Sequence, residues 1–428
     1  MGNRTTLLLA GIICAISIAC GTTMDSPKVQ VQAEEVLAKI EELNQPVQFE
    51  NCIIIGDLNL TSKVVYKPLH FNNSIFLGSI YSNSTNFKYP VYFEESDFSS
   101  NVYFVSSNFN STVDFALANF NSHTDFSMTK FNGNTDFSGS NFSSPVVFRG
   151  SKFKGETLFM LSIFNNDSDF RSSLFSGFAD FRLSHFKSSA DFYGSKFEKK
   201  AFFYDAEFNG STSFSNGEFD DDANFEEVVF WGNLSLTKTR YDKLFIRWHN
   251  IKSGLIYDAS AYMLLLQNFK NLGYFEDYDS CYFQYRKEHR GQPWPLVSGL
   301  DLLIRKGIDI FLEWFYGYGT KPLNAIYFSI AIVIVFGIFW RAIGLGGLND
   351  VTGEIDKDWE KPDSIYDMLS FSTTIFLSGT RLYIDPPAIP KIKGRSKSLV
   401  KNAFTFERIL GALFSILFIM AIGGTTIR

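Results

Sequence analysis

Phenylalanine recurs through the first half of the chain with gaps that alternate between five and six residues. One register repeats every 11 residues from Phe93 to Phe225, the other from Phe98 to Phe230, and every position in both is Phe. Extended back to residue 49, both registers stay apolar except at Ser82. A fixed period of this kind predicts a repeat architecture.

The spacing within the unit excludes a helix and a flat strand. At about 100° per residue, gaps of five and six would send neighbouring rings to different sides of a helix. The intervening Ser, Asn, Gly, Thr and Asp are also poor helix formers. In a flat strand an odd gap would place successive rings on opposite faces. The chain must therefore turn between Phe residues.

A square coil satisfies this spacing. If each step of five or six residues forms one side, every Phe can point inward, and Phe115, Phe137 and Phe159 stack in one ladder. The residue two before each Phe is usually small, as at Ala118 and Thr124, and fits inside beside the ring.

The triplets "ANF", "TDF" and "SNF" resemble the pentapeptide-repeat family, whose unit is a small residue, Asp or Asn, a central Leu or Phe and two free positions. The resemblance implies a mainly β fold, a right-handed quadrilateral β-helix, over residues 49–250. This chain adds one residue to every second unit, which we expect to widen two of the four faces.

The flanking segments are expected to cover the ends of the solenoid, because open strand edges invite pairing with other chains. Val36, Ile40 and Leu43 have helical spacing and predict a cap helix within residues 21–48. Residues 251–295 predict a helical hairpin that breaks at Gly273. The hairpin faintly resembles one tetratricopeptide unit, although a single unit makes no peptide groove.

Length and composition allow two or more domains: the chain has 428 residues, is 45% hydrophobic and contains 47 Phe. Its net charge of −6 is mild and it has no basic patch, so nucleic acid is not an expected partner. The rod is also not acidic enough to mimic DNA. Cys52 and Cys281 do not suggest a disulfide framework and are interpreted as buried small residues rather than functional thiols.

The first 20 residues predict export. Arg4 precedes a short apolar run that is too short to span a membrane. The "SIAC" sequence resembles a lipoprotein processing site with Cys20 as the lipidation candidate. An uncleaved short anchor is the alternative.

The C-terminal part of the chain predicts a membrane module. An amphipathic interfacial helix and hinge are expected within residues 296–322. Within 323–428, the segments Leu323–Trp340 and Arg408–Gly424 are apolar enough for two spans, with a buried core hairpin as the alternative.

Between the spans, the segment 364–380 resembles the re-entrant loop of the two-span potassium-channel pore module. That family places a short helix before a Gly-Tyr-Gly filter of backbone carbonyls. Here the filter sequence is lost, and the pore-loop candidates are Thr373, Thr374, Ser378, Gly379 and Thr380. A "GYG" at 317–319 precedes both spans and is interpreted as a link between the surface helix and the membrane.

The basic residues between the spans, such as Lys391, Lys393 and Arg395, favour a cytoplasmic connection by the positive-inside rule. The repeat domain would then be extracytoplasmic, on a cell-membrane protein that contacts membrane lipid. The resemblance implies a homotetramer through the membrane module, and the rod could also meet a protein or surface partner.

Enzyme chemistry has little support, because the five His residues lie far apart and no H-E-x-x-H, G-x-S-x-G or phosphate-loop motif occurs. No cofactor or metal is expected. Asp114 and Asp136, like Asp169 and Asp191, should lie on adjacent coils, where stacked carboxylates could attract calcium, but an exposed turn position is the favoured interpretation.

This order of domains resembles multidomain pentapeptide-repeat membrane proteins of bacteria and methanogenic archaea. Two functions are consistent with it. The first is a non-enzymatic membrane protein with a degenerate channel-like pore that transports ions. The second is a membrane-anchored surface solenoid that has a structural or partner-binding role without conduction.

Overall fold

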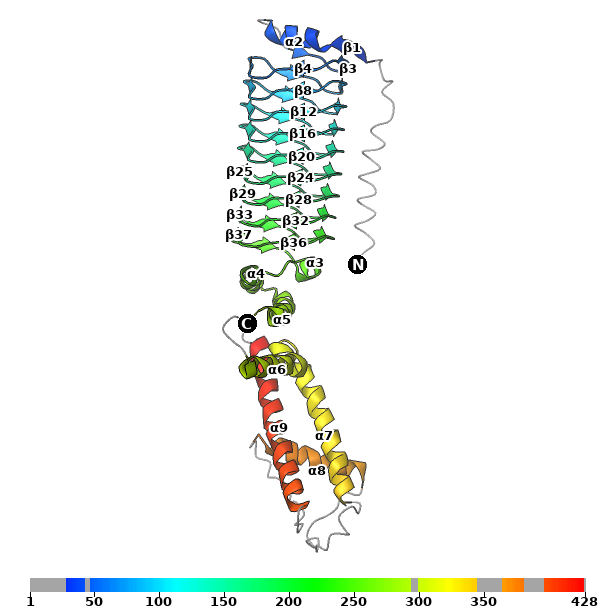
Figure 1. Cartoon of the computed structure of the whole chain (residues 1–428), viewed down its shortest axis with the longest axis vertical. Coiled ribbons are helices and arrows are strands. Elements are labelled where there is room, and N and C mark those ends of the chain that lie inside the picture. Colours follow the sequence, from blue (N-terminus) through cyan, green and yellow to red (C-terminus); the bar gives the residue numbers. More distant parts are fainter. Residues whose placement is uncertain (1–27, 43–46, 294–298, 345–363, 381–395, 427–428) are drawn as a thin grey trace. The chain divides into compact units, whose positions relative to one another are not determined.

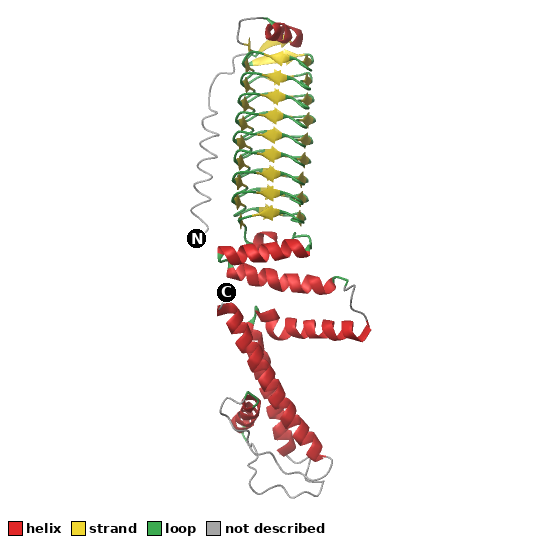
Figure 2. Cartoon of the chain, turned by 90° about the vertical axis from the view of Figure 1, so that its left-hand side faces the viewer, coloured by secondary structure: helices red, strands yellow, loops and turns green. Residues whose placement is uncertain are grey.

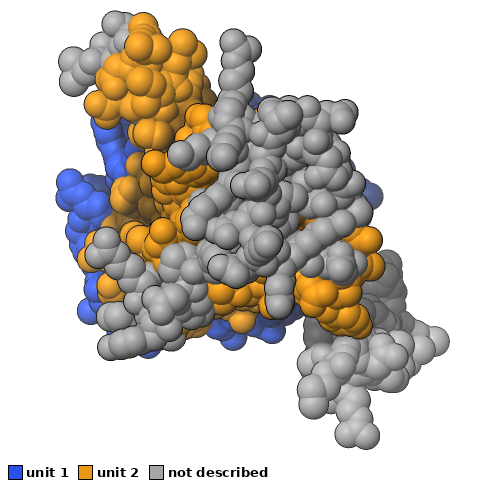
Figure 3. Space-filling model, turned by 90° about the horizontal axis from the view of Figure 1, so that it is seen from below, with its two compact units in different colours: residues 1–261 blue, residues 262–428 orange. Residues whose placement is uncertain are grey.

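The computed structural model describes residues 28–42, 47–293, 299–344, 364–380 and 396–426. The chain divides into two compact units, Met1–Ala261 and Tyr262–Arg428, which Figure 3 colours blue and orange. The export signal and Cys20 lie outside the described residues.

The first unit contains a parallel β-solenoid with four sheets, as the Phe spacing predicted (Figures 1 and 2). Strands pair with those 22 residues away, as Phe98 with Phe120 and Phe120 with Phe142. We call the four faces sheets A to D. Their first and last strands are β1 (Val29–Gln32) and β35 (Val229–Phe230) in A, β2 (Val47–Gln48) and β38 (Leu244–Phe245) in B, β4 (Leu58–Asn59) and β36 (Leu234–Ser235) in C, and β5 (Val64–Val65) and β37 (Arg240–Tyr241) in D.

Apart from β1 and β3 (Cys52–Ile55), each strand has two residues, one pointing inward and one outward. The inward Phe rings form the core. Phe137 is fully buried, and its ring stacks on Phe115 at 5.0 Å and on Phe159 at 4.9 Å between centroids. Rings from neighbouring faces meet edge to face, as Phe126 does with Phe137 at 5.5 Å. Both arrangements are favourable aromatic geometries.

The additional residue of every second unit does not widen two faces, so that expectation was wrong. Strands on all four faces keep the same length, and the extra residue is accommodated in alternate corners. One residue of each such corner adopts positive φ, as Leu117 (57°), Met128 (58°) and Gly139 (66°) do. A left-handed residue reverses the chain sharply, at a cost of about 1–2 kcal/mol for a non-Gly residue.

The small inward residues beside these corners carry a ladder of hydroxyl groups. Ser140 Oγ donates to the carbonyl of Phe115 at 2.7 Å, and Ser162 Oγ to that of Phe137 at 2.7 Å. The hydroxyl groups thus bond to backbone carbonyls of the preceding coil, inside the apolar core. Ser82, at a Phe position, is buried and its hydroxyl has no partner.

Both ends of the solenoid are covered within the first unit. At the start, β1 extends sheet A and α2 (Ala33–Glu41) buries Ala33, Val36 and Ile40, which confirms the cap helix. Leu43 lies outside the described residues. At the other end, α3 (Trp248–Ile251) buries Trp248, and Asn250 Nδ2 donates to the carbonyl of Val228 at 2.8 Å.

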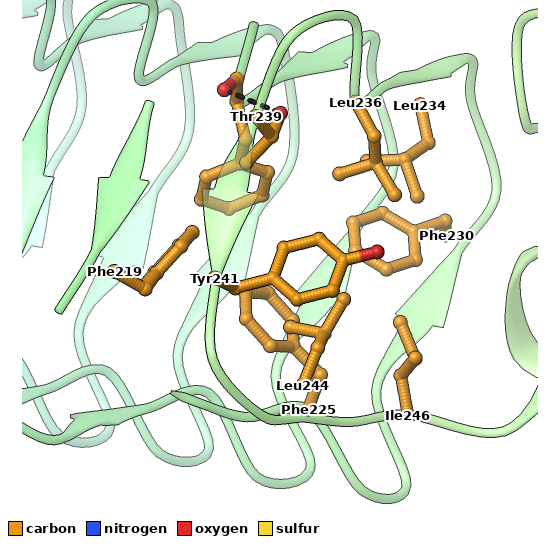
Figure 4. Close-up of a pocket in the computed structure, with 10 residues that line it drawn as sticks. Phe219, Phe225, Phe230, Leu234, Leu236, Thr239, Tyr241, Leu244 and Ile246 are labelled. Atoms are coloured by element: carbon orange, nitrogen blue, oxygen red, sulfur yellow. Dashed lines mark hydrogen bonds between the residues drawn. The ribbon is translucent and has the colours of Figure 1, made fainter. Parts of the chain in front are cut away.

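The column of rings ends at a small apolar cavity of about 10 Å³ (Figure 4). Its lining includes Leu236 and Ile246, which replace Phe near the last coil. Thr239 Oγ1 beside it donates to the carbonyl of Phe214 at 2.9 Å. A cavity of this size holds at most one water molecule, so it is no ligand site.

The second unit is helical. Its helices are α4 (Ala259–Leu272, which begins at the boundary), α5 (Phe275–Gly291), α6 (Gly299–Tyr316), the short η1 (Gly317–Gly319), α7 (Pro322–Gly344), α8 (Ile365–Ser378) and α9 (Ser396–Thr426). The predicted hairpin is present: α4 and α5 join at Gly273 with φ 73°, and Tyr262 stacks near Tyr285 at 5.7 Å.

Two helices are long and apolar enough to cross a membrane, over Pro322–Ala342 and Ser398–Gly423. The second begins ten residues before the predicted start at Arg408. Charged residues near Arg408 ended the apolar pattern early, although Glu407 is fully buried in the packed helices.

Candidate functional site

The pore-loop candidates all lie on α8 or directly after it. Thr373 and Thr374 are within the helix, Ser378 is its last residue, and Gly379 and Thr380 form the following turn. The helix has 14 residues, too few to cross a membrane. It begins with a capping box, in which Ser364 and Asp367 bond to each other's backbone N–H groups.

Glycines allow α8 to approach α9 closely. A Cβ atom on Gly411 would lie 1.9 Å from the carbonyl oxygen of Phe376, and one on Gly379 would lie 2.0 Å from that of Arg408. Neither helix could move this close with a larger residue at these positions. Small residues are the usual means of close packing between membrane helices.

The carbonyl groups at the end of α8 are occupied within the chain. Ser378 Oγ donates to the carbonyl of Ile375 at 2.7 Å, and Thr380 N donates to that of Leu377 at 3.1 Å. Arg408 Nη2 donates to the Ser378 carbonyl at 3.4 Å. In this conformation these groups are not arranged as a row of free ion ligands, in agreement with the lost filter sequence.

A polar centre that the sequence analysis missed lies where α7, α8 and α9 pack together. Glu407 of α9 has no exposed surface, and Trp340 of α7 donates its indole N–H to Glu407 Oε2 at 2.7 Å. The hydroxyl of Ser372 on α8 donates to Glu407 Oε1 in a short hydrogen bond. Around the centre, Ile375 and Val400 pack with Trp340 in an apolar cluster. A lone Glu between apolar segments was the only signal in the sequence.

A second buried network lies on the elements before the spans. Asp309 of α6 is buried and accepts hydrogen bonds from Arg286 of α5 at 2.7 Å and from the Tyr318 hydroxyl at 2.7 Å. Arg290 pairs with Glu313 at 2.5 Å. Burial and the hydrogen bond to Asp309 raise the pKa of Tyr318. The "GYG" is therefore a buried turn bonded to α5 and α6, and not a loose link.

The acidic residues of the rod lie as predicted on adjacent coils. Asp114 pairs in register with Asp136, and Asp169 with Asp191. Asp114 Oδ1 accepts a hydrogen bond from Ala116 N at 2.9 Å, which is the bond of an Asx turn. Burial, followed by the nearby charge of Asp136, raises the pKa of Asp114.

Asp169 is bound by arginines: Arg149 and Arg171 each donate to it at 2.6 Å. Within the described part of the chain, no group of three or more His, Cys, Asp or Glu side chains could hold a metal ion. The turn interpretation thus accounts for the contacts of these carboxylates.

The two cysteines are free and buried, as expected. Burial, more than the neighbouring acidic residues, raises the pKa of Cys281. A buried thiol of this kind is unreactive.

Comparison with known families supports the repeat assignment. The model for Pentapeptide repeats (9 copies) matches residues 83–129 and 192–240, so the rod contains pentapeptide repeats. Neither curated proteins nor solved structures gave a match. No family match covers the C-terminal helices.

Proposed function

We propose that this chain, whose first unit is a pentapeptide-repeat solenoid, is a non-enzymatic membrane protein whose helices α7, α8 and α9 form a channel-like, ion-conducting module. The observation that carries the proposal is the placement of α8. This short helix lies between two helices that are long enough to span a membrane, and it packs on both through close backbone contacts.

The outer faces of the long helices support a membrane setting. Val335 and Ile338 on α7 are 63% and 57% exposed, and Ile419 on α9 is 62% exposed. Exposed apolar faces of this size require cover by lipid or by other copies. We propose a homotetramer, in which lipid covers part of these faces and neighbouring copies cover the rest.

Single-channel recording in planar bilayers tests conduction with a matched pair of variants. Thr374 on α8 and Thr405 on α9 each donate a side-chain hydrogen bond to the carbonyl four residues earlier, at 2.8 and 2.9 Å. Thr374→Lys should reduce cation current, because α8 would border the pore, whereas Thr405→Lys should not. If the wild type passes no current under any ion gradient, or if both variants behave alike, conduction is excluded.

We further propose that the rod is extracytoplasmic on a cell-membrane protein, on the basis of the basic residues between the spans. Protease treatment of intact cells tests this orientation. The repeat domain should be cleaved or released without lysis. Protection of the whole rod until the cells are lysed would place it in the cytoplasm.

A binding role of the rod is the second candidate function. Leu117 and Leu161, at costly left-handed positions of one corner, are 50% and 42% exposed. An exposed apolar residue at such a position favours a contact surface over a purely structural role. In this case a protein that lacks residues 365–408 should still bind its protein or surface partner, and a loss of binding would contradict the anchor model.

A further inference from the structure

The helical unit contains two buried carboxyl groups with opposite electrostatic surroundings. Asp309 is 5% exposed and lies within 2.7 Å of Arg286 and 3.4 Å of Arg290, so two guanidinium groups compensate its charge. Glu407 is fully buried, and its oxygens accept hydrogen bonds only from the neutral groups of Trp340 and Ser372.

The charged residues on the helices around Glu407 do not compensate it. They are Arg341 on α7, Asp367 on α8, and Lys401 and Arg408 on α9, and none forms an ion pair with Glu407 in the described part of the chain. Arg408 is the next residue, but neighbours on a helix point in different directions. Its guanidinium instead reaches the Ser378 carbonyl and the Phe404 ring.

A buried carboxylate without a cation pays a large desolvation cost, whereas its neutral form does not. Two neutral donors offset only part of that cost. We propose that Glu407 is a proton-binding site that carries a proton at neutral pH when α7, α8 and α9 are packed together. The inference rests on the proposed membrane setting of these helices, but it does not require that the module conducts ions.

The site also joins three helices through one side chain. Trp340 and Ser372 lie 67 and 35 residues from Glu407 in the chain, and their hydrogen bonds connect α7 and α8 to α9. When the carboxylic acid releases its proton to water, a carboxylate remains, and its hydration favours separation of α8 from α9. Protonation of Glu407 and the packing of α8 are therefore coupled.

Infrared spectroscopy of the full-length protein in lipid nanodiscs tests the site directly. A protonated carboxyl group has a C=O stretching band that a carboxylate lacks. At neutral pH the wild type should show this band and Glu407→Gln should lack it. Asp309→Asn is the matched control and should retain the band, because Asp309 is paired with arginines. Ser372→Ala should shift the band by removing one donor, even if Glu407→Gln folds poorly.

Hydrogen exchange provides a second readout. In peptides that cover 365–378, protection in the wild type relative to Glu407→Gln should fall as the carboxyl band disappears at alkaline pH. Identical infrared spectra of wild type and Glu407→Gln at neutral pH, together with no shift in Ser372→Ala, would overturn the proposal. These results do not depend on current recordings, so failure of conduction and failure of the proton site are distinguishable.

Discussion

Replacement of Phe137 by Ala tests the central feature of the rod, the column of stacked rings. The ring is fully buried between Phe115 and Phe159 and also meets Phe126 and Phe148 edge to face at 5.5 and 5.4 Å. Removal of the ring loses its burial and leaves a cavity that the regular coils above and below cannot close. Substitutions of this kind cost about 3–5 kcal/mol.

The loss should be local, because each coil contacts only its neighbours. Hydrogen exchange should show reduced protection in the coils that contain residues 115–159 and little change near the ends of the rod. Denaturant unfolding of the full-length protein gives the total loss. Phe178→Ala is the control: Phe178 is partly exposed, outside the column, and its replacement should cost about 1 kcal/mol or less. Equal losses for the two variants, or uniform exchange along the rod, would refute a core of inward rings.

Three further predictions follow from individual side chains. Ser82→Ala should stabilise the rod by about 1 kcal/mol, because it removes a buried hydroxyl without a partner, whereas Ser140→Ala should destabilise it by a similar amount in denaturant titrations; the same sign for both would contradict the hydroxyl ladder. Burial raises the pKa of Asp114, so its folded form favours the proton and stability falls as pH rises through that pKa; Asp114→Asn should raise the melting temperature at neutral pH but not in acid. Hydrogen bonds from Ser189 and Ser188 lower the pKa of Asp167, so Asp167→Asn should lower the melting temperature at neutral pH and have no effect in acid; matching pH profiles for the two variants would contradict both assignments. Gly411→Ala should separate α8 from α9 and increase hydrogen exchange in α8, and unchanged exchange would show that the close contact is not needed.

The repeat domain could be predicted from the sequence because its tertiary contacts are periodic. Each ring packs on the ring 22 residues away, so one spacing determines the four faces, the core and the strand register. The cap helix through Val36 and Ile40 and the break at Gly273 were also predicted correctly, since helical spacing and glycine act locally.

The corners required the structure. The sequence shows an additional residue in every second unit, but only backbone geometry shows that this residue turns left-handed at positions such as Leu117. Likewise the small residues predicted inside the rod proved to be hydrogen-bond donors to the preceding coil. A count of residues cannot distinguish a wider face from a tighter turn, because both use the same length of chain.

The polar centre of the helical unit depended entirely on tertiary structure. Glu407 looked like the end of an apolar segment, and its partners Trp340 and Ser372 lie on other helices at distances along the chain that follow no period. The rod repeats one local rule, so its sequence contains its contacts. The helical unit is assembled once, and only the packing of α7, α8 and α9 determines that this carboxyl group is buried and where its donors lie.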